Sequence, residues 1–119
     1  MDKRKITNLD NLDFKPFDKY GKSIKGWYWH KISFDEKTNF GTYISKLEPG
    51  TKTIPHTHTG YEEFLISDGE LMDSDRSIFQ KVDFISYKPN STYSSYTKKG
   101  CLILTFMRGH NNQIKKDKL

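Results

Sequence analysis

The sequence of 119 residues lacks several features that would assign it to a particular class of protein. It has one cysteine, Cys101, so neither an intrachain disulfide nor an all-cysteine zinc site can form within the chain. No segment approaches the ~20 consecutive apolar residues of a membrane-spanning helix. Polar residues follow the basic N-terminus where a signal peptide would have an apolar stretch. We therefore expect a protein of the reducing cytoplasm that has no membrane partner.

Apolar residues are also scarce, at 34% of the chain, but many of those present are large, and aromatic residues make up 14%. A chain of this length can form one hydrophobic core and is too short for two. We therefore expect a single domain whose interior is filled mainly by aromatic rings. The aromatic residues expected to fill and line it are Trp27, Trp29, Phe40, Phe64, Phe79, Phe84 and Phe106.

The net charge of +5 suggests a nucleic acid as partner until its distribution is examined. Residues 1–22 carry a net charge of +2, residues 23–108 carry +1, and residues 109–119 carry +2. No stripe of Lys and Arg at helical spacing is present, and no basic run alternates with stacking aromatic residues. The charge pattern therefore favours a protein that binds no nucleic acid.

Short β-prone segments separated by turn residues dominate the chain from Trp27 onward, and Pro16 excludes a long helix before them. Turn signals recur about every 8–12 residues, which is typical of β-sandwiches and barrels. The expected strands are 27–32, 40–47, 61–67, 70–72, 78–79, 82–87, 93–96 and 101–107. Cys101 begins the most apolar of them, so we expect a buried, unreactive thiol.

These strands divide the chain into an N-terminal arm (1–25), an all-β body (26–109) and a polar C-terminal tail (110–119) that we expect to be frayed. Two roles fit the arm equally well. It packs on its own body through Phe14 and Phe17, or it donates a strand to the sheet of a partner.

The residues that point to chemistry lie between Gly50 and Gly69. His56 and His58 are two positions apart, so on a strand they share one face. Glu62 follows a turn at residues 59–60, and a hairpin there would bring its carboxylate beside the two imidazoles. Two imidazoles and a carboxylate suit a divalent metal such as Fe, Mn, Ni, Zn or Co, with open positions for a ligand.

The spacing from Gly50 through His56, His58 and Glu62 to Gly69 resembles the first conserved motif of the cupin superfamily. The sequence of residues 56–69 is similar to that of the cupin domain of ChrR-type anti-sigma factors and their small free-standing relatives. The resemblance covers residues 26–108. It implies a single-domain cupin β-barrel, also called a jelly roll or double-stranded β-helix, with the metal in the barrel mouth. Homodimers are common in this superfamily.

The second cupin motif departs from the family, because its expected histidine falls on Tyr93, or on Ser94 if the register slips by one. Asn90 replaces the turn glycine of that motif and can adopt the same left-handed backbone. Three interpretations stay open. In the first, the site is a facial triad of two histidines and one carboxylate. In the second, Tyr93 completes the set of ligands directly or through a water. In the third, the site has degenerated and binds metal weakly or not at all. Spacing favours Glu62 over its neighbour Glu63 as the carboxylate ligand.

Two functions fit these residues, and the sequence alone does not decide whether the chain is an enzyme. In the first, a metal at the site binds a small oxygenated substrate, as in a dioxygenase or another metal-dependent enzyme. In the second, the chain is a non-catalytic ChrR-like module that senses or binds a small ligand, with a degenerate metal site.

Overall fold

The structure is a computed structural model that describes residues 3–58, 60–108 and 111–113, with side chains except at positions 56, 58 and 111–113. This part of the chain contains strands and no helix, so the all-β prediction is confirmed. Within it, no helix is long and apolar enough to span a membrane. The strands are β1 (Lys15–Pro16), β2 (Trp27–Asp35), β3 (Phe40–Leu47), β4 (His56–His58), β5 (Tyr61–Asp73), β6 (Ile78–Gln80), β7 (Phe84–Tyr87), β8 (Thr92–Tyr93), β9 (Ser95–Tyr96), β10 (Cys101–Arg108) and β11 (Asn111–Gln113).

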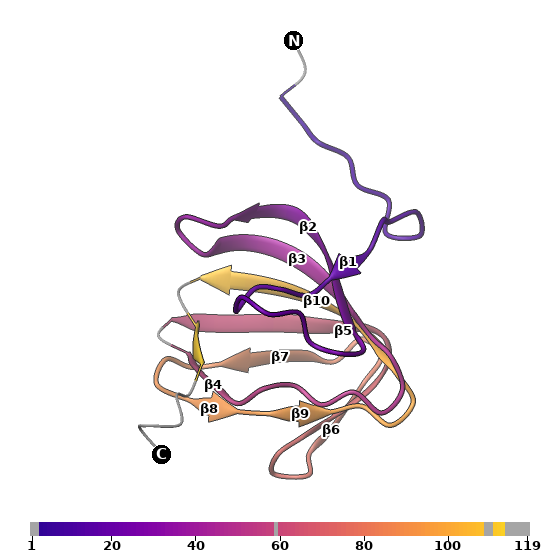
Figure 1. Cartoon of the computed structure of the whole chain (residues 1–119), viewed down its shortest axis with the longest axis vertical. Coiled ribbons are helices and arrows are strands. Elements are labelled where there is room, and N and C mark those ends of the chain that lie inside the picture. Colours follow the sequence, from indigo (N-terminus) through magenta and orange to yellow (C-terminus); the bar gives the residue numbers. More distant parts are fainter. Residues whose placement is uncertain (1–2, 59, 109–110, 114–119) are drawn as a thin grey trace.

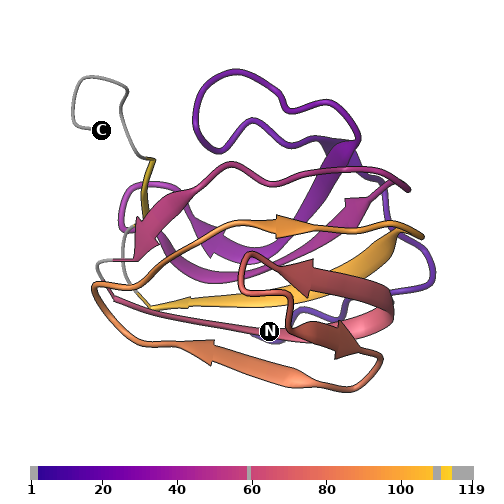
Figure 2. The same cartoon turned by 90° about the horizontal axis from the view of Figure 1, so that it is seen from below.

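The strands form two antiparallel sheets that curve around a common interior (Figures 1 and 2). The larger sheet has the order β1-β2-β3-β10-β5-β6, and β7 and β9 also pair with β5. The smaller sheet has the order β11-β4-β8. The long strand β5 pairs near its start with β7 and near its end with β6 and β9. It therefore bends from one side of the interior to the other.

The turn expected after residue 67 is absent, because β5 continues through it as one strand of 13 residues. A bulge takes its place, since Leu102 pairs with Asp68 while Ile103 pairs with Ile66. Gly69 follows the bulge with φ of 81°. A Cβ atom built there would lie 2.2 Å from the carbonyl oxygen of Gly100. The glycine of the motif is thus required by a close backbone approach as well as by its dihedral angle.

The prediction that a hairpin pairs the two histidine positions with Glu62 is wrong. Strand β4 pairs with β8 and β11, whereas β5 pairs with strands of the larger sheet. The two parts of the motif therefore come from different sheets. Residues 111–113 of the expected frayed tail form β11 beside β4, because the chain returns to that edge after β10.

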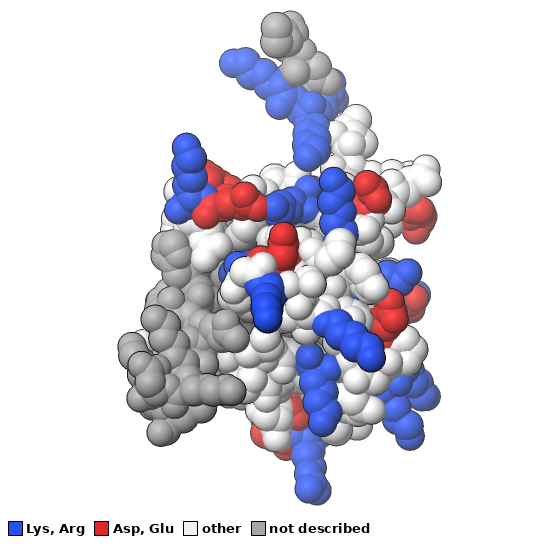
Figure 3. All heavy atoms as spheres, in the orientation of Figure 1, with Lys and Arg blue, Asp and Glu red and all other residues white. Residues whose placement is uncertain are grey.

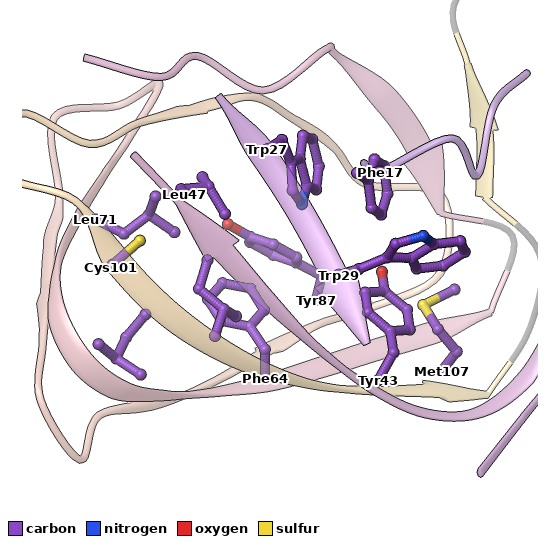
Figure 4. Close-up of a cluster of buried hydrophobic side chains, with 12 residues drawn as sticks. Phe17, Trp27, Trp29, Tyr43, Leu47, Phe64, Leu71, Tyr87, Cys101 and Met107 are labelled. Carbon is purple, nitrogen blue, oxygen red and sulfur yellow. The ribbon is translucent and has the colours of Figure 1, made fainter. Parts of the chain in front are cut away.

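Inward and outward residues alternate along β10 and along each part of β5 on either side of the bulge, which places the core between the sheets. The core residues are Phe17, Trp27, Trp29, Tyr43, Leu47, Phe64, Ile66, Leu71, Tyr87, Cys101, Ile103 and Met107, most of them drawn in Figure 4. Phe79 packs against this cluster from a half-buried position. Phe40 and Phe84 were expected inside but are 51% and 56% exposed. Phe106 takes an outward position in β10 and stacks on Phe84 at 6.1 Å between ring centroids.

The N-terminal arm joins the core through Phe17, which is completely buried. Its ring stacks on Trp27 with centroids 3.9 Å apart and planes 6° apart. Its N–H donates to the Trp27 carbonyl at 2.9 Å. Charged side chains of both signs are interspersed on the face of the molecule that Figure 3 shows.

Candidate metal site

Strand β4 places the two histidine positions in register with Tyr93. Residue 56 lies directly opposite Tyr93 in the antiparallel pair of β4 and β8, and Thr57 lies opposite Thr92. The Thr57 and Thr92 hydroxyls are hydrogen-bonded at 3.0 Å on the outer side. Strand alternation therefore gives positions 56 and 58 the same parity as Tyr93. The imidazoles of His56 and His58 themselves lie outside the described side chains.

Glu62 is buried on the inner face of β5, with 7% of its surface exposed. It lies in register with Tyr87 of β7 and Met107 of β10. Burial first, and then the negative charge of Glu62, raise the pKa of Tyr43 well above its usual value. The pKa of Tyr87 is raised by burial, by its bond to Asp73 and by the same carboxylate. These effects show that the Glu62 carboxylate acts on the phenols of the interior.

Glu63 occupies the opposite face of the strand. Its carboxylate forms an ion pair with Arg108 at 2.7 Å, with the Glu63 side chain 23% exposed. The sequence could not separate the two glutamates by hydrophobic pattern, because apolar residues flank both. The structure separates them by direction, and Glu62 is the carboxylate that faces the interior.

Tyr93 is held in place by a stack of aromatic and polar groups. Its ring lies on that of Tyr87 with centroids 4.4 Å apart and planes 14° apart. The Tyr87 hydroxyl donates to the buried carboxylate of Asp73 at 2.6 Å. Asp73 also accepts from the Ser95 hydroxyl at 3.3 Å and from the Ser74 N–H at 3.0 Å. The position of Tyr93 is therefore coupled, through Tyr87, to a satisfied polar cluster inside the protein.

The turn before Tyr93 has the predicted backbone, since Asn90 has φ of 69°. Ser94, the other candidate of the second motif, lines a surface hollow of about 290 Å³ together with Arg76 and Ser95. The phenol at position 93 and the hydroxyl at position 94 thus have different surroundings. Of the two, Tyr93 packs against the core cluster.

Three polar residues of this interior were not singled out by the sequence: Tyr43, Asp73 and Lys19. Tyr43 shares the inward parity of Leu47 on β3, so alternation along that strand would have indicated it. Asp73 lies at the far end of β5, and the expected turn after residue 67 hid its connection to the motif. Lys19 belongs to the arm, where no periodic pattern indicates direction.

The donor set fits a divalent metal by its chemistry. The described donors are the buried carboxylate of Glu62 and the phenol of Tyr93, which lies opposite position 56, and the sequence adds two imidazoles. These are ligands that Fe, Mn, Ni, Zn and Co accept. Among the described side chains, no three His, Cys, Asp or Glu groups cluster as metal ligands do. That set does not include the imidazoles at positions 56 and 58.

Two curved antiparallel sheets around an aromatic interior, with this motif at one end, define a small cupin-type β-barrel. The chain belongs to the family of ChrR cupin-like domains, which it matches over residues 2–111. No curated protein matches the chain.

Solved structures share the fold at low sequence identity. A protein of Methylibium petroleiphilum PM1, proposed to be an acetylacetone dioxygenase, superposes with a TM-score of 0.80 at 16% identity, covering 98% of this chain and 85% of that one. The acetylacetone dioxygenase of Acinetobacter johnsonii gives 0.73 at 16% identity, with coverages of 98% and 85%. The Rhodobacter sphaeroides complex of SigE with the anti-sigma factor ChrR gives 0.63 at 16% identity, covering 85% of this chain and 52% of that one.

Proposed function

We propose that the chain is a metal-dependent cupin in which His56, His58 and Glu62 hold a divalent metal that binds a small oxygenated substrate. The observation that carries the proposal is the register of β4 on β8. It pairs position 56 with Tyr93, whose ring stacks on Tyr87, the residue opposite Glu62 in the pair of β5 and β7. The membership of the ChrR cupin-like family supports the same site.

Each residue has a distinct part in this proposal. His56, His58 and Glu62 form a facial triad, which leaves positions of the metal open for the oxygen atoms of a ligand. A bound divalent metal would polarise a carbonyl or enolate oxygen. Tyr93 stands where the resemblance places a third histidine, and its phenol, opposite position 56, would border a metal held there. Tyr87 and the aromatic core keep bulk water from the inner end of the site.

Metal analysis tests the site directly. We expect stoichiometric divalent metal in the purified protein, and loss of that metal in the His56→Ala/His58→Ala double variant. The Glu62→Gln variant should bind metal at least about tenfold more weakly. The matched Glu63→Gln variant loses only the ion pair to Arg108 and should bind metal as the wild type does. Equal metal affinity in the two glutamine variants would contradict the assignment of Glu62.

Acid should release the metal, because only neutral imidazoles coordinate and an isolated histidine has a pKa of about 6.5. We expect metal content to fall below about pH 6. Full retention of metal at about pH 5, in protein that circular dichroism shows to be folded, would contradict ligation by imidazole.

Dioxygenase-type chemistry is the finer part of the proposal, and the similarity to the fold of an acetylacetone dioxygenase motivates it. The iron-loaded protein should consume oxygen when a chelating diketone is added, and the double histidine variant should not.

The alternative is a non-catalytic ChrR-like module that binds a small ligand, and the family match favours it. Diketone binding with no oxygen consumption, for every metal tried, would select the module over the enzyme.

We further propose that the chain acts in the cytoplasm as a homodimer. The exposed Phe84, whose ring stacks on the half-buried Phe106, supports an interface on the outer face of the large sheet. Sedimentation equilibrium of the wild type and of Phe84→Ser would test it. A monomeric wild type at micromolar concentration would refute the dimer.

A further inference from the structure

Tyr87 connects the two parts of the metal-binding motif, which come from different sheets. It lies opposite Glu62 in the antiparallel pair of β5 and β7, which belongs to the larger sheet. Its ring stacks on that of Tyr93, from β8 of the smaller sheet, with centroids 4.4 Å apart and planes 14° apart. Tyr93 in turn lies opposite position 56. One buried ring therefore adjoins both the carboxylate and the histidine strand of the motif.

The stack on Tyr87 matters for Tyr93 because β8 is very short. This strand consists of Thr92 and Tyr93, and its ladder with β4 covers those two residues. So short a ladder restricts a side chain less than a long strand within a sheet does. The direction of the Tyr93 phenol therefore depends on the ring beneath it, and Tyr87 supplies that ring from the aromatic core (Figure 4).

The Tyr87 ring is itself anchored by Asp73, at the end of β5. The Tyr87 hydroxyl donates to the Asp73 carboxylate at 2.6 Å, and both residues are buried. This length is typical of a hydroxyl that donates to an ionised carboxylate, a bond about twice as strong as one between neutral groups. The bond fixes the Tyr87 ring at its outer end, and with it the surface on which Tyr93 lies.

The use of a carboxylate here needs a reason, because an amide would accept the same hydrogen bond without a buried charge. Asp73 borders the surface hollow of about 290 Å³ that Lys52 and Arg76 also line. Solvent and these two cations lower the cost of keeping the Asp73 side chain ionised. What the charge provides is a stronger bond to Tyr87, and therefore a better-defined position of the ring.

We propose that Asp73 is a positioning residue of the candidate metal site. Through its bond to Tyr87 it fixes the ring between the two parts of the motif, and so holds the Tyr93 phenol beside the metal ligands. This proposal rests on the proposed metal site. It assigns a part in metal binding to a residue at the opposite end of β5 from Glu62.

Cobalt binding tests this role, because Co²⁺ accepts the proposed ligands and its visible absorption reports their geometry. The full chain is titrated with Co²⁺ at neutral pH. Tyr87→Phe keeps the ring and loses the bond, and we expect it to bind Co²⁺ about tenfold more weakly, with a changed spectrum at saturation. Asp73→Asn keeps an oxygen that accepts a weaker, neutral bond, so its affinity should fall by about threefold. A purely structural role would lower the free energy of unfolding in urea and leave both cobalt readouts of the folded protein unchanged.

The double variant Tyr87→Phe/Asp73→Asn shows by which route Asp73 acts. Without the Tyr87 hydroxyl the proposed route is absent, so the double variant should bind Co²⁺ within about twofold of Tyr87→Phe. Ser95→Ala is the matched control, because it removes another hydroxyl that donates to Asp73, at 3.3 Å, and leaves the bond to Tyr87 in place. It should bind Co²⁺ within about twofold of the wild type.

Every outcome bears on one of the two proposals. Absence of a cobalt spectrum in the folded wild type would overturn the metal site and this inference with it. Wild-type affinity and spectrum in Tyr87→Phe would overturn the inference alone. So would two single effects that multiply in the double variant, or equal weakening in Ser95→Ala and Tyr87→Phe. If Tyr87→Phe does not fold, Asp73→Asn should still bind Co²⁺ more weakly than Ser95→Ala, and equal affinities of these two would overturn the inference.

Discussion

Replacing Phe17 with alanine removes the side chain that joins the arm to the barrel. Phe17 is completely buried, and its ring contacts Trp27 at 3.9 Å and Trp29 at 4.8 Å between centroids. Burying a phenylalanine side chain is worth about 1.5–3 kcal/mol. The cavity and the lost ring contacts raise the expected cost to about 3–5 kcal/mol. That is a large fraction of the ~5–15 kcal/mol by which domains are stable.

Urea unfolding followed by tryptophan fluorescence measures this loss. Phe17→Leu, which keeps most of the volume, should lose less than about 1.5 kcal/mol. Phe14→Ala is the control within the arm, because Phe14 is half-buried and has Lys46 6.0 Å from its ring centroid. It should cost less than about 1 kcal/mol. Equal stability of Phe17→Ala and Phe14→Ala would refute the reasoning, since it would mean that the arm contributes nothing to the core.

Three further predictions follow from single features of the interior. The pKa values of Tyr43 and Tyr87 are raised by burial, so their contribution to stability is constant below about pH 10 and falls at higher pH, where unfolded phenols ionise and folded ones do not. Urea midpoints that do not fall above about pH 10 would contradict it. Burial raises the pKa of Cys101 to about 11, so a thiol reagent should modify it no faster than the protein unfolds. Gly69→Ala should destabilise more than Gly50→Ala, because both have positive φ but only at Gly69 would a Cβ atom meet backbone, at 2.2 Å; equal losses in thermal unfolding would show that the close approach has no cost.

Much of the fold followed from patterns within short segments. The bounds of β3 agree with the predicted strand 40–47, and β10 extends the predicted strand 101–107 by one residue. Both are long and apolar, and turn residues bound them. The left-handed backbone of Asn90 also followed from the sequence, because few residues tolerate that conformation. Local chemistry determines features of this kind.

Errors arose where pairing between distant segments decides the structure. Ser67, Asp68 and Gly69 have the composition of a turn, yet β10 pairs with Ile66, Asp68 and Gly69, so only Ser67 is bulged and the strand continues. The two histidine positions and Glu62 are close in sequence. Even so, β4 pairs with β8 and β11 in the smaller sheet, while Glu62 belongs to the larger sheet. Turn propensity is weaker than the hydrogen bonds of a complete ladder.

The sequence by itself determined the all-β class, the family and the residue types of the candidate site, because these depend on spacing and composition. Only the tertiary structure decided which glutamate faces the interior, since Arg108 holds Glu63 outside while Glu62 is buried. The structure also decided that the arm packs on its own barrel through Phe17. No local pattern encodes that contact, because it depends on the insertion of Phe17 between rings of another strand.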